Sequence, residues 1–195
     1  MNPKYYVDLE AHSGRGPLDP GEVDFLMSQM FKGMHLAIVQ ECGENASSQN
    51  AIAIAFPLAG ETGHGGLLRV FSDDEKVLGR FLRHPHIHRY VRHLHATIQE
   101  VPAIEQFATF SRNRVADRLS PSARKRARHR LKELGFAIPA KQREQPGFVI
   151  ALQSQSNGET FLLRIQRRDL PDRRAVDGAV FNAYGLSRTH AVPMF

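Results

Sequence analysis

The sequence lacks the features that are typical of secreted and membrane proteins. Its 195 residues include a single cysteine, Cys42, which excludes an intrachain disulfide framework and a zinc site built from cysteines. No apolar run approaches the ~18 residues of a membrane span. The opening segment, MNPKYYVDLE, contains no apolar core of the kind found in secretory signals. We therefore expect a cytoplasmic protein that does not associate with membranes.

Acidic residues are scarce in the second half of the chain. Overall, 26 Lys and Arg outnumber 20 Asp and Glu, which gives a formal net charge of +6. Residues 1–101 carry a net charge of −3, whereas residues 102–195 contain 17 basic and 8 acidic residues, a net charge of +9. Most of the basic residues are arginines, whose planar guanidinium suits bidentate contacts to phosphate. This asymmetry favours a second half that binds nucleic acid over one that is merely solubilising.

Hydropathy patterns in the first hundred residues predict the element order β-α-β-β-α-β. Strands are predicted over 5–9, 52–56, 67–71 and 96–101. The first helix begins with Asp19 as N-cap and Glu22 three residues later, and it ends near Gly43. The second is capped by Ser72 or Asp73. This order is typical of a ferredoxin-like domain, which we place at 1–101 of an α+β protein.

Pro102 marks the predicted boundary to a smaller α+β domain over 102–195. This domain is predicted to contain a strand over 106–115, a basic helix over about 121–134 and a β-hairpin over about 148–168. Asn157-Gly158 is the strongest turn signal for that hairpin. A last strand is predicted over 179–186.

The basic helix is the clearest candidate for contact with nucleic acid. Residues 122–134 read SARKRARHRLKEL, which places a narrow apolar stripe opposite a basic face with Glu133 as the only acid. Such a face is repulsive unless phosphates neutralise it, so we predict a helix laid into a nucleic-acid groove. A solvated basic face is the alternative. The predicted contacts from this helix are Arg124, Lys125, Arg128 and Arg130.

Ten histidines raise the question of a metal site. Six of them lie at position 64 and within 84–95, where the spacing H-P-H-I-H lacks the cysteine or carboxylate partners of known zinc patterns. Pro85 also interrupts the helix that would align them. We therefore predict a polar surface segment, no metal and no cofactor. His35 stands apart, beside the apolar stripe of the first helix, and by its pattern alone a half-buried helix histidine is favoured over a catalytic one.

Two further segments are specific enough to indicate a family. Residues 152–161 read LQSQSNGETF, and residues 184–195 read YGLSRTHAVPMF. Together with the helix that bears His35 and with the basic helix, they resemble the CRISPR RNA-processing endoribonucleases of type I-F systems, in the same order and over most of the chain. The resemblance implies that the second domain holds a stem-loop of the CRISPR repeat. It also implies cleavage at the 3′ base of that stem without a metal.

The resemblance assigns three catalytic positions. His35 matches the catalytic histidine, Ser154 the serine that holds the scissile ribose, and Tyr184 the tyrosine that supports the site. The chemistry agrees with this assignment, because RNA carries its own nucleophile in the 2′-hydroxyl next to the phosphate. Histidine has a pKa suited to activating it. Attack would leave a 2′,3′-cyclic phosphate and a 5′-hydroxyl.

Further positions are predicted to bind RNA. Phe161 matches the aromatic residue that stacks on the terminal base pair, and Arg112 matches the arginine that reads the guanine beside the cut. Arg114 stands where the family has a glutamine, so recognition of the next base can differ. Ser156 in the hairpin is also predicted to contact RNA.

Three functions remain open at this stage. The first is a metal-independent endoribonuclease that stays on the mature CRISPR RNA hairpin, with other subunits of a type I-F surveillance complex as partners. The second is a non-catalytic subunit that binds the RNA hairpin. The third is a protein that binds duplex DNA through the basic helix, in which case His35, Ser154 and Phe161 would have no role.

Overall fold

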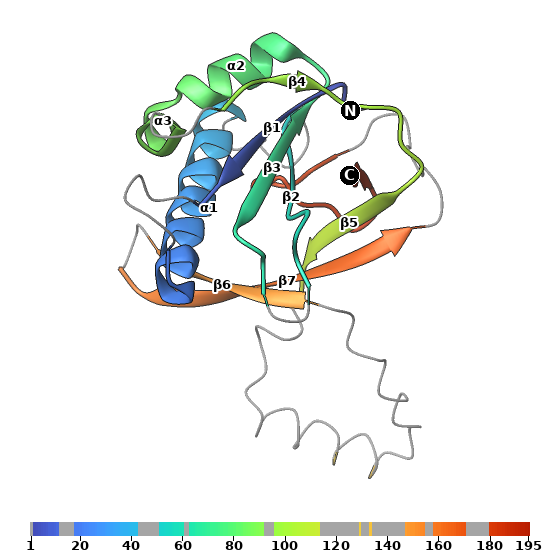
Figure 1. Ribbon diagram of the computed structural model, residues 1–195. Helices are drawn as coiled ribbons and strands as arrows, with labels where there is room; N and C mark the ends of the chain where they lie inside the picture. Colours follow the sequence, from blue (N-terminus) through green and yellow to red (C-terminus); the bar gives the residue numbers. More distant parts are fainter. Residues whose placement is uncertain are drawn as a thin grey trace.

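Two four-stranded antiparallel sheets, each from a different half of the chain, form the framework of the molecule (Figure 1). The structure is a computed structural model. It describes residues 2–11, 18–42, 51–60, 63–91, 96–113, 129, 133, 147–154, 158–170 and 180–195. Across these residues, every helix is too short or too polar to cross a membrane.

The first sheet has the ferredoxin-like strand order β2-β3-β1-β4. Its strands are β1 (Tyr5–Glu10), β2 (Ala53–Ala55), β3 (Leu67–Ser72) and β4 (Gln99–Glu100). Strand β1 lies between β3 and β4, and β2 pairs with the other edge of β3. The predicted α+β class and β-α-β-β-α-β order are therefore confirmed. Strand β4 is shorter than the predicted 96–101, because it pairs only with Tyr5 and Tyr6 at one edge of the sheet.

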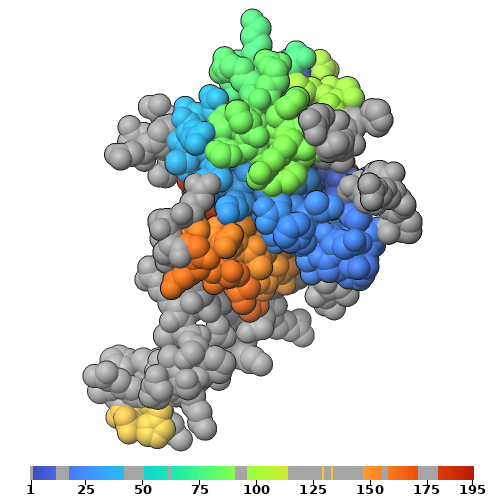
Figure 2. All heavy atoms as spheres, turned by 90° about the vertical axis from the view of Figure 1, so that its left-hand side faces the viewer, coloured from blue at the N-terminus to red at the C-terminus, as the bar shows by residue number. Residues whose placement is uncertain are grey.

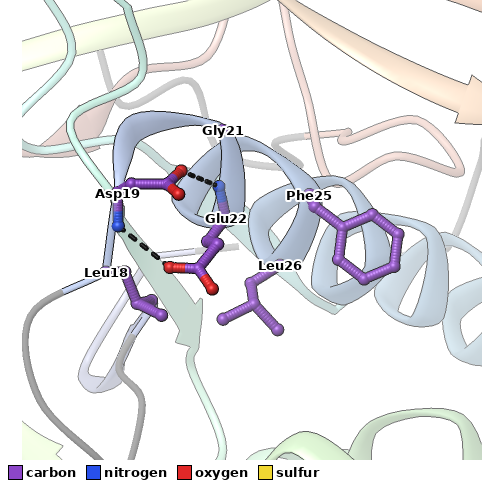
Figure 3. Close-up of a pocket in the computed structure, with 6 residues that line it drawn as sticks. All are labelled: Leu18, Asp19, Gly21, Glu22, Phe25 and Leu26. Carbon is purple, nitrogen blue, oxygen red and sulfur yellow. Dashed lines mark hydrogen bonds between the residues drawn. The ribbon is translucent and has the colours of Figure 1, made fainter.

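Helix α1 (Pro20–Cys42) begins as the sequence predicts. Figure 3 shows the two reciprocal hydrogen bonds at its start: Glu22 N–H donates to Asp19 Oδ1 at 2.9 Å, and Asp19 N–H donates to Glu22 Oε2 at 3.0 Å. Leu18, Phe25 and Leu26 line a shallow pocket beside this cap. The cap satisfies main-chain donors that a helix start otherwise leaves unpaired. The buried face of the helix comprises Met27, Met30, Phe31, Met34, Ala37 and Ile38.

Two short helices follow β3. Helix α2 (Glu75–Arg83) is capped by Asp74, whose carboxylate accepts from Lys76 N–H at 2.7 Å. The predicted cap at Ser72 or Asp73 therefore precedes the actual cap by one or two residues. Ser72 instead accepts from Asp74 N–H with its hydroxyl. Helix α3 (Pro85–Val91) occupies part of the histidine-rich segment. Pro85 separates the two helices but also starts the second, because the first helical residue needs no main-chain donor.

The second sheet has the order β6-β7-β5-β8. Its strands are β5 (Phe107–Arg112), β6 (Gly147–Gln153), β7 (Thr160–Leu170) and β8 (Val192–Pro193). Strands β6 and β7 form the predicted hairpin, with Leu152 opposite Phe161. The predicted strand over 179–186 is wrong: the described residues 180–186 contain a tight turn, and the last strand is β8.

One hydrophobic core extends through both sheets. Phe56, which follows β2, lies 4.7 Å from Phe148 on β6 and 5.7 Å from Phe31 on α1, measured between ring centroids. Buried Arg69 on β3 forms a bidentate ion pair with Asp8 and donates to the main-chain oxygen of Phe195 at 2.7 Å. Its guanidinium also lies 3.9 Å from the Phe195 ring centre. These contacts join the C-terminal segment to the first sheet.

Candidate active site on helix α1

The ring of Tyr184 stacks on two rings of helix α1, those of Phe31 and His35. His35 follows Phe31 by four residues, so both project from the same side of the helix. The Tyr184 ring lies against both of them: its centroid is 4.0 Å from that of His35 at an interplanar angle of 9°, and 5.9 Å from that of Phe31 at 13°. This stacking fixes the plane of the His35 imidazole.

A main-chain carbonyl fixes the orientation of the same imidazole within its plane. His35 Nδ1 lies 2.8 Å from the carbonyl oxygen of Ala183. A carbonyl oxygen can only accept a hydrogen bond, so Nδ1 carries the proton in the neutral ring. The lone pair therefore resides on Nε2, which makes Nε2 the basic nitrogen.

Burial tunes the basicity of His35. Desolvation lowers the pKa of His35 below its ordinary value of 6.5, and the hydrogen bond to Ala183 opposes this by a smaller amount. The two influences leave the ring neutral at neutral pH. A neutral imidazole with a fixed tautomer is the form that can accept a proton.

The turn that carries Tyr184 was missed by sequence reasoning, which predicted a strand there. Asn182 Oδ1 accepts from the main-chain N–H groups of Tyr184 at 2.8 Å and Leu186 at 3.2 Å. Gly185 has a φ of +69°, which is readily accessible only to glycine. The order Asn-x-x-Gly was the available signal, because both residue types favour turns.

Ser154 stands at the start of the β6–β7 turn. Its main-chain N–H donates to the carbonyl of Glu159 at 2.8 Å, and its carbonyl accepts from Gly158 N–H at 3.1 Å. The neighbouring Gln153 lines a groove of about 450 Å³ together with Ser28 and other residues of α1. Ser28 and His35 are seven residues apart on α1, which is about 10 Å, or two turns, along one side of a helix. The strand that leads to Ser154 therefore contacts the helix that bears His35.

The space-filling view shows the arrangement of these elements. In Figure 2, the blue surface of α1 lies between the green surface of α2 and α3 and the orange surface of the β6–β7 hairpin. Both neighbours contact α1 directly. Part of α1 beside the hairpin is thus exposed on the molecular surface, including Phe25.

Two of the predicted RNA contacts stand on the second sheet. Arg112 is the last residue of β5 and is half-buried, opposite Ile165 of β7. Phe161 on β7 is half-buried and packs against the hydrophobic core. The structure therefore brings His35 and Tyr184 into direct contact, whereas the second sheet positions Ser154, Arg112 and Phe161.

The other predicted RNA contacts lie outside the described residues. These are Arg114, Arg124, Lys125, Arg128, Arg130 and Ser156. In the predicted basic helix the structure describes His129 and Glu133, which are helical and exposed. Their side chains form an i,i+4 contact, with 3.1 Å between Nδ1 and Oε1, so the one acid of this helix does have a basic partner.

The histidine-rich segment is partly built into the fold. The ring centroids of His84 and His86 lie 5.3 Å apart. Ile87, which precedes His88 in the chain, is buried. His93 and His95 lie outside the described residues. Within the described ranges, no three His, Cys, Asp or Glu side chains are grouped so that they could hold a metal ion.

His64 is buried and serves a structural contact. Its Nε2 lies 2.9 Å from Asp24 on α1, and its Nδ1 accepts from Gly66 N–H at 3.1 Å. The ring thereby joins the β2–β3 turn to α1.

Comparison with known proteins identifies a family. The model of a family described as "CRISPR-associated protein (Cas_Csy4)" matches residues 17–195. No curated protein sequence matches the chain.

Two solved structures are distantly similar to the chain. A protein provisionally named a chlorite dismutase is 13% identical, with a TM-score of 0.26, over 88% of this chain and 80% of its own. Csf5, named as a type IV Cas6 crRNA endonuclease, is 7% identical, with a TM-score of 0.31, over 85% of this chain and 89% of its own. Scores this low support no argument about function.

Proposed function

The chain belongs to the Csy4 family of CRISPR-associated proteins and is an endoribonuclease of CRISPR RNA processing, and from this premise we propose how it cuts. It cleaves repeat RNA at the 3′ base of the stem-loop by attack of the RNA's own 2′-hydroxyl, without a metal ion. The observation that carries this proposal is the fixed imidazole of His35, with its proton on Nδ1 and its basic nitrogen at Nε2. The enzyme would act in the cytoplasm.

The reaction follows from that nitrogen. His35 Nε2 takes the proton of the 2′-hydroxyl, and the resulting oxygen attacks the adjacent phosphorus. The bond from phosphorus to the 5′ oxygen breaks, and that oxygen takes up a proton. The products are a 2′,3′-cyclic phosphate and a 5′-hydroxyl. Burial supports this role, because it keeps the pKa of His35 low enough for the ring to be neutral before the reaction.

Two other side chains complete the proposed catalytic group. The Tyr184 ring holds the imidazole plane by stacking on it. The Ser154 hydroxyl, presented by the β6–β7 turn, binds the scissile ribose and holds its 2′-oxygen in line with the phosphate. Holding the reacting atoms in place in this way lowers the entropic part of the barrier.

The second half of the chain supplies the proposed RNA interface. Its net charge of +9 supports binding to phosphates. Arg112 reads the base beside the cut, Phe161 stacks on the last base pair, and Arg114 and Ser156 add contacts. The basic helix enters the groove of the stem through Arg124, Lys125, Arg128 and Arg130. The enzyme then stays on the mature hairpin, within a complex of further subunits.

The experiment uses labelled repeat RNA with excess EDTA. Cleavage at one bond is expected, and replacing the ribose 5′ of that bond by deoxyribose should block it while binding persists. Cutting of the deoxy substrate at the same bond would mean that water is the nucleophile. Binding without any cutting would support a hairpin-binding subunit instead, and tighter binding to duplex DNA would support a DNA-binding protein.

Substitution of one histidine separates chemistry from binding. His35→Ala is expected to abolish cleavage with little change in affinity for the deoxy RNA, because Nε2 acts on a proton and not on phosphate charge. His88→Ala is the matched control, since His88 is exposed on α3. Loss of affinity in parallel with activity in His35→Ala alone would contradict the proposed role.

A further inference from the structure

Asn182 folds the main chain just before Tyr184. Its side-chain oxygen accepts from Tyr184 N–H and from Leu186 N–H. Its main-chain groups close the same turn, because its N–H donates to the Leu186 carbonyl at 2.9 Å and its carbonyl accepts from Gly185 N–H at 2.8 Å. Asn182 therefore takes part in four hydrogen bonds within one five-residue turn.

The end of this turn is anchored to both sheets. Ile54 N–H on β2 donates to the carbonyl of Gly185 at 2.9 Å, and Ser187 N–H donates to the carbonyl of Phe110 on β5 at 2.9 Å. Leu186 and Ser187 are buried. The position of the turn is thus set by the sheets, and its internal shape is set by Asn182.

Both contacts that hold His35 come from this turn. The carbonyl of Ala183 accepts from Nδ1, and the ring of Tyr184 lies over the imidazole. Ala183 and Tyr184 directly follow Asn182 in the chain. A change in the shape of the turn would move the carbonyl and the ring together, and the imidazole would lose both its plane and its tautomer.

We propose that Asn182 is a positioning residue for catalysis: by accepting from Tyr184 N–H and Leu186 N–H, it aims the Ala183 carbonyl at His35 Nδ1 and so keeps Nε2 as the base. Only the expected effect of Asn182 on cleavage rests on the proposed function. Its effect on the His35 tautomer holds whatever the protein cuts.

The role requires a short side chain with an acceptor oxygen. Asparagine and aspartate both supply this oxygen and favour such turns, whereas alanine supplies none. Asn182→Asp is therefore the conservative variant that retains both hydrogen bonds, and Asn182→Ala removes them. Asp74→Ala is the matched control, because it removes a similar bond from a side chain to a main-chain N–H on α2.

The first measurement is made on the protein without RNA. The imidazole nitrogen chemical shifts of His35, measured by NMR at about pH 8, distinguish the two neutral tautomers. The Nδ1–H tautomer is expected in the wild type, in Asn182→Asp and in Asp74→Ala, and a mixture of tautomers in Asn182→Ala. An unchanged tautomer in Asn182→Ala would overturn the proposal, even if the variant is less stable.

The second measurement is the single-turnover cleavage rate with saturating protein at about pH 8, where His35 is neutral in every variant. Asn182→Ala should cut about ten- to a hundredfold more slowly, because small displacements of a catalytic group have effects of this size. Its affinity for the uncleavable deoxy RNA should change less than about twofold, and Asn182→Asp should recover most of the rate. Equal slowing in Asn182→Ala and Asp74→Ala, or no recovery in Asn182→Asp, would also overturn the proposal. If the wild type cuts no repeat RNA but Asn182→Ala still loses the tautomer, the proposed function fails and the positioning role stands.

Discussion

Gly185 provides a quantitative test of how closely the Tyr184 turn approaches the first sheet. Its φ of +69° places it in the left-handed region, which costs a residue with a Cβ about 1–2 kcal/mol. A Cβ at this position would also lie 2.7 Å from Cγ1 and 3.0 Å from Cδ1 of Ile54. Ile54 is 1% exposed and is held in β2, so it has little room to move. Such overpacking typically costs a further 1–3 kcal/mol or so.

Two other glycines separate these contributions. Gly158 has a φ of +70°, but a Cβ added there would meet no atom within 4 Å, so Gly158→Ala carries the backbone strain alone. Gly60 has neither a left-handed φ nor a neighbour within 4 Å, so Gly60→Ala carries neither cost. It should be neutral or stabilising by up to about 1 kcal/mol, because alanine reduces the entropy of the unfolded chain.

The assay is urea unfolding followed by circular dichroism for the three variants and the wild type. The free energy of unfolding should fall in the order Gly60→Ala, Gly158→Ala, Gly185→Ala. The last two should differ by about 1–3 kcal/mol, which is the cost of the contact with Ile54. The m-values should agree, so that the difference reports stability and not a changed unfolded state. If Gly185→Ala is no more destabilised than Gly158→Ala, the turn does not press against β2 as described.

Four other predictions concern His35, Arg69 and the basic helix. Burial lowers the pKa of His35, and the neutral ring is the base. The single-turnover rate should therefore rise with pH through an inflection below pH 6.5 and then level off. In a profile measured from about pH 5 to 8, an inflection above pH 6.5 would contradict this reasoning. Because folding lowers the pKa of His35, the unfolded chain binds the proton more tightly than the folded protein does. The stability that His35 contributes is therefore complete above pH 6.5 and is lost as the pH falls through the folded-state pKa. Urea unfolding at each pH would detect this loss. Arg69→Met should reduce the free energy of unfolding by about 1–3 kcal/mol, because Asp8 and the Phe195 main-chain oxygen lose their donor. In a double-mutant cycle with Asp8→Asn, additive effects on this free energy would mean that the ion pair contributes nothing. Replacing Arg124, Arg128 and Arg130 together by alanine should weaken binding to repeat RNA and flatten its salt dependence, and an unchanged salt slope would remove the basic helix from the interface.

Local signals in the sequence were sufficient for several elements. The start of α1 follows from Asp19 and Glu22, whose reciprocal hydrogen bonds involve only residues three apart. The β6–β7 hairpin follows from two alternating segments around Asn157-Gly158, and Gly158 adopts the left-handed conformation that such a turn needs. The order of elements in the first half then leads to the ferredoxin-like sheet.

Other elements depended on neighbours that are remote in sequence. A strand was predicted over 179–186, yet the chain turns after Asn182, because Asn182 accepts from Tyr184 N–H and Leu186 N–H and because β2 and β5 bind the end of the turn. Strand β4 is limited to two residues, since β1 offers it only two partners. Part of the histidine-rich segment forms α3, because Ile87 is buried and α3 packs on α1.

The candidate site shows the same division between local and remote information. The sequence alone determined that His35 lies on a helix, beside an apolar stripe, and its pattern by itself left that histidine without a chemical role. Only the tertiary structure decided which nitrogen of His35 is basic, because that depends on the carbonyl of Ala183, 148 positions away in the chain. Periodicity reports which face of a helix is buried. The proton on an imidazole is placed by the groups that folding brings against it.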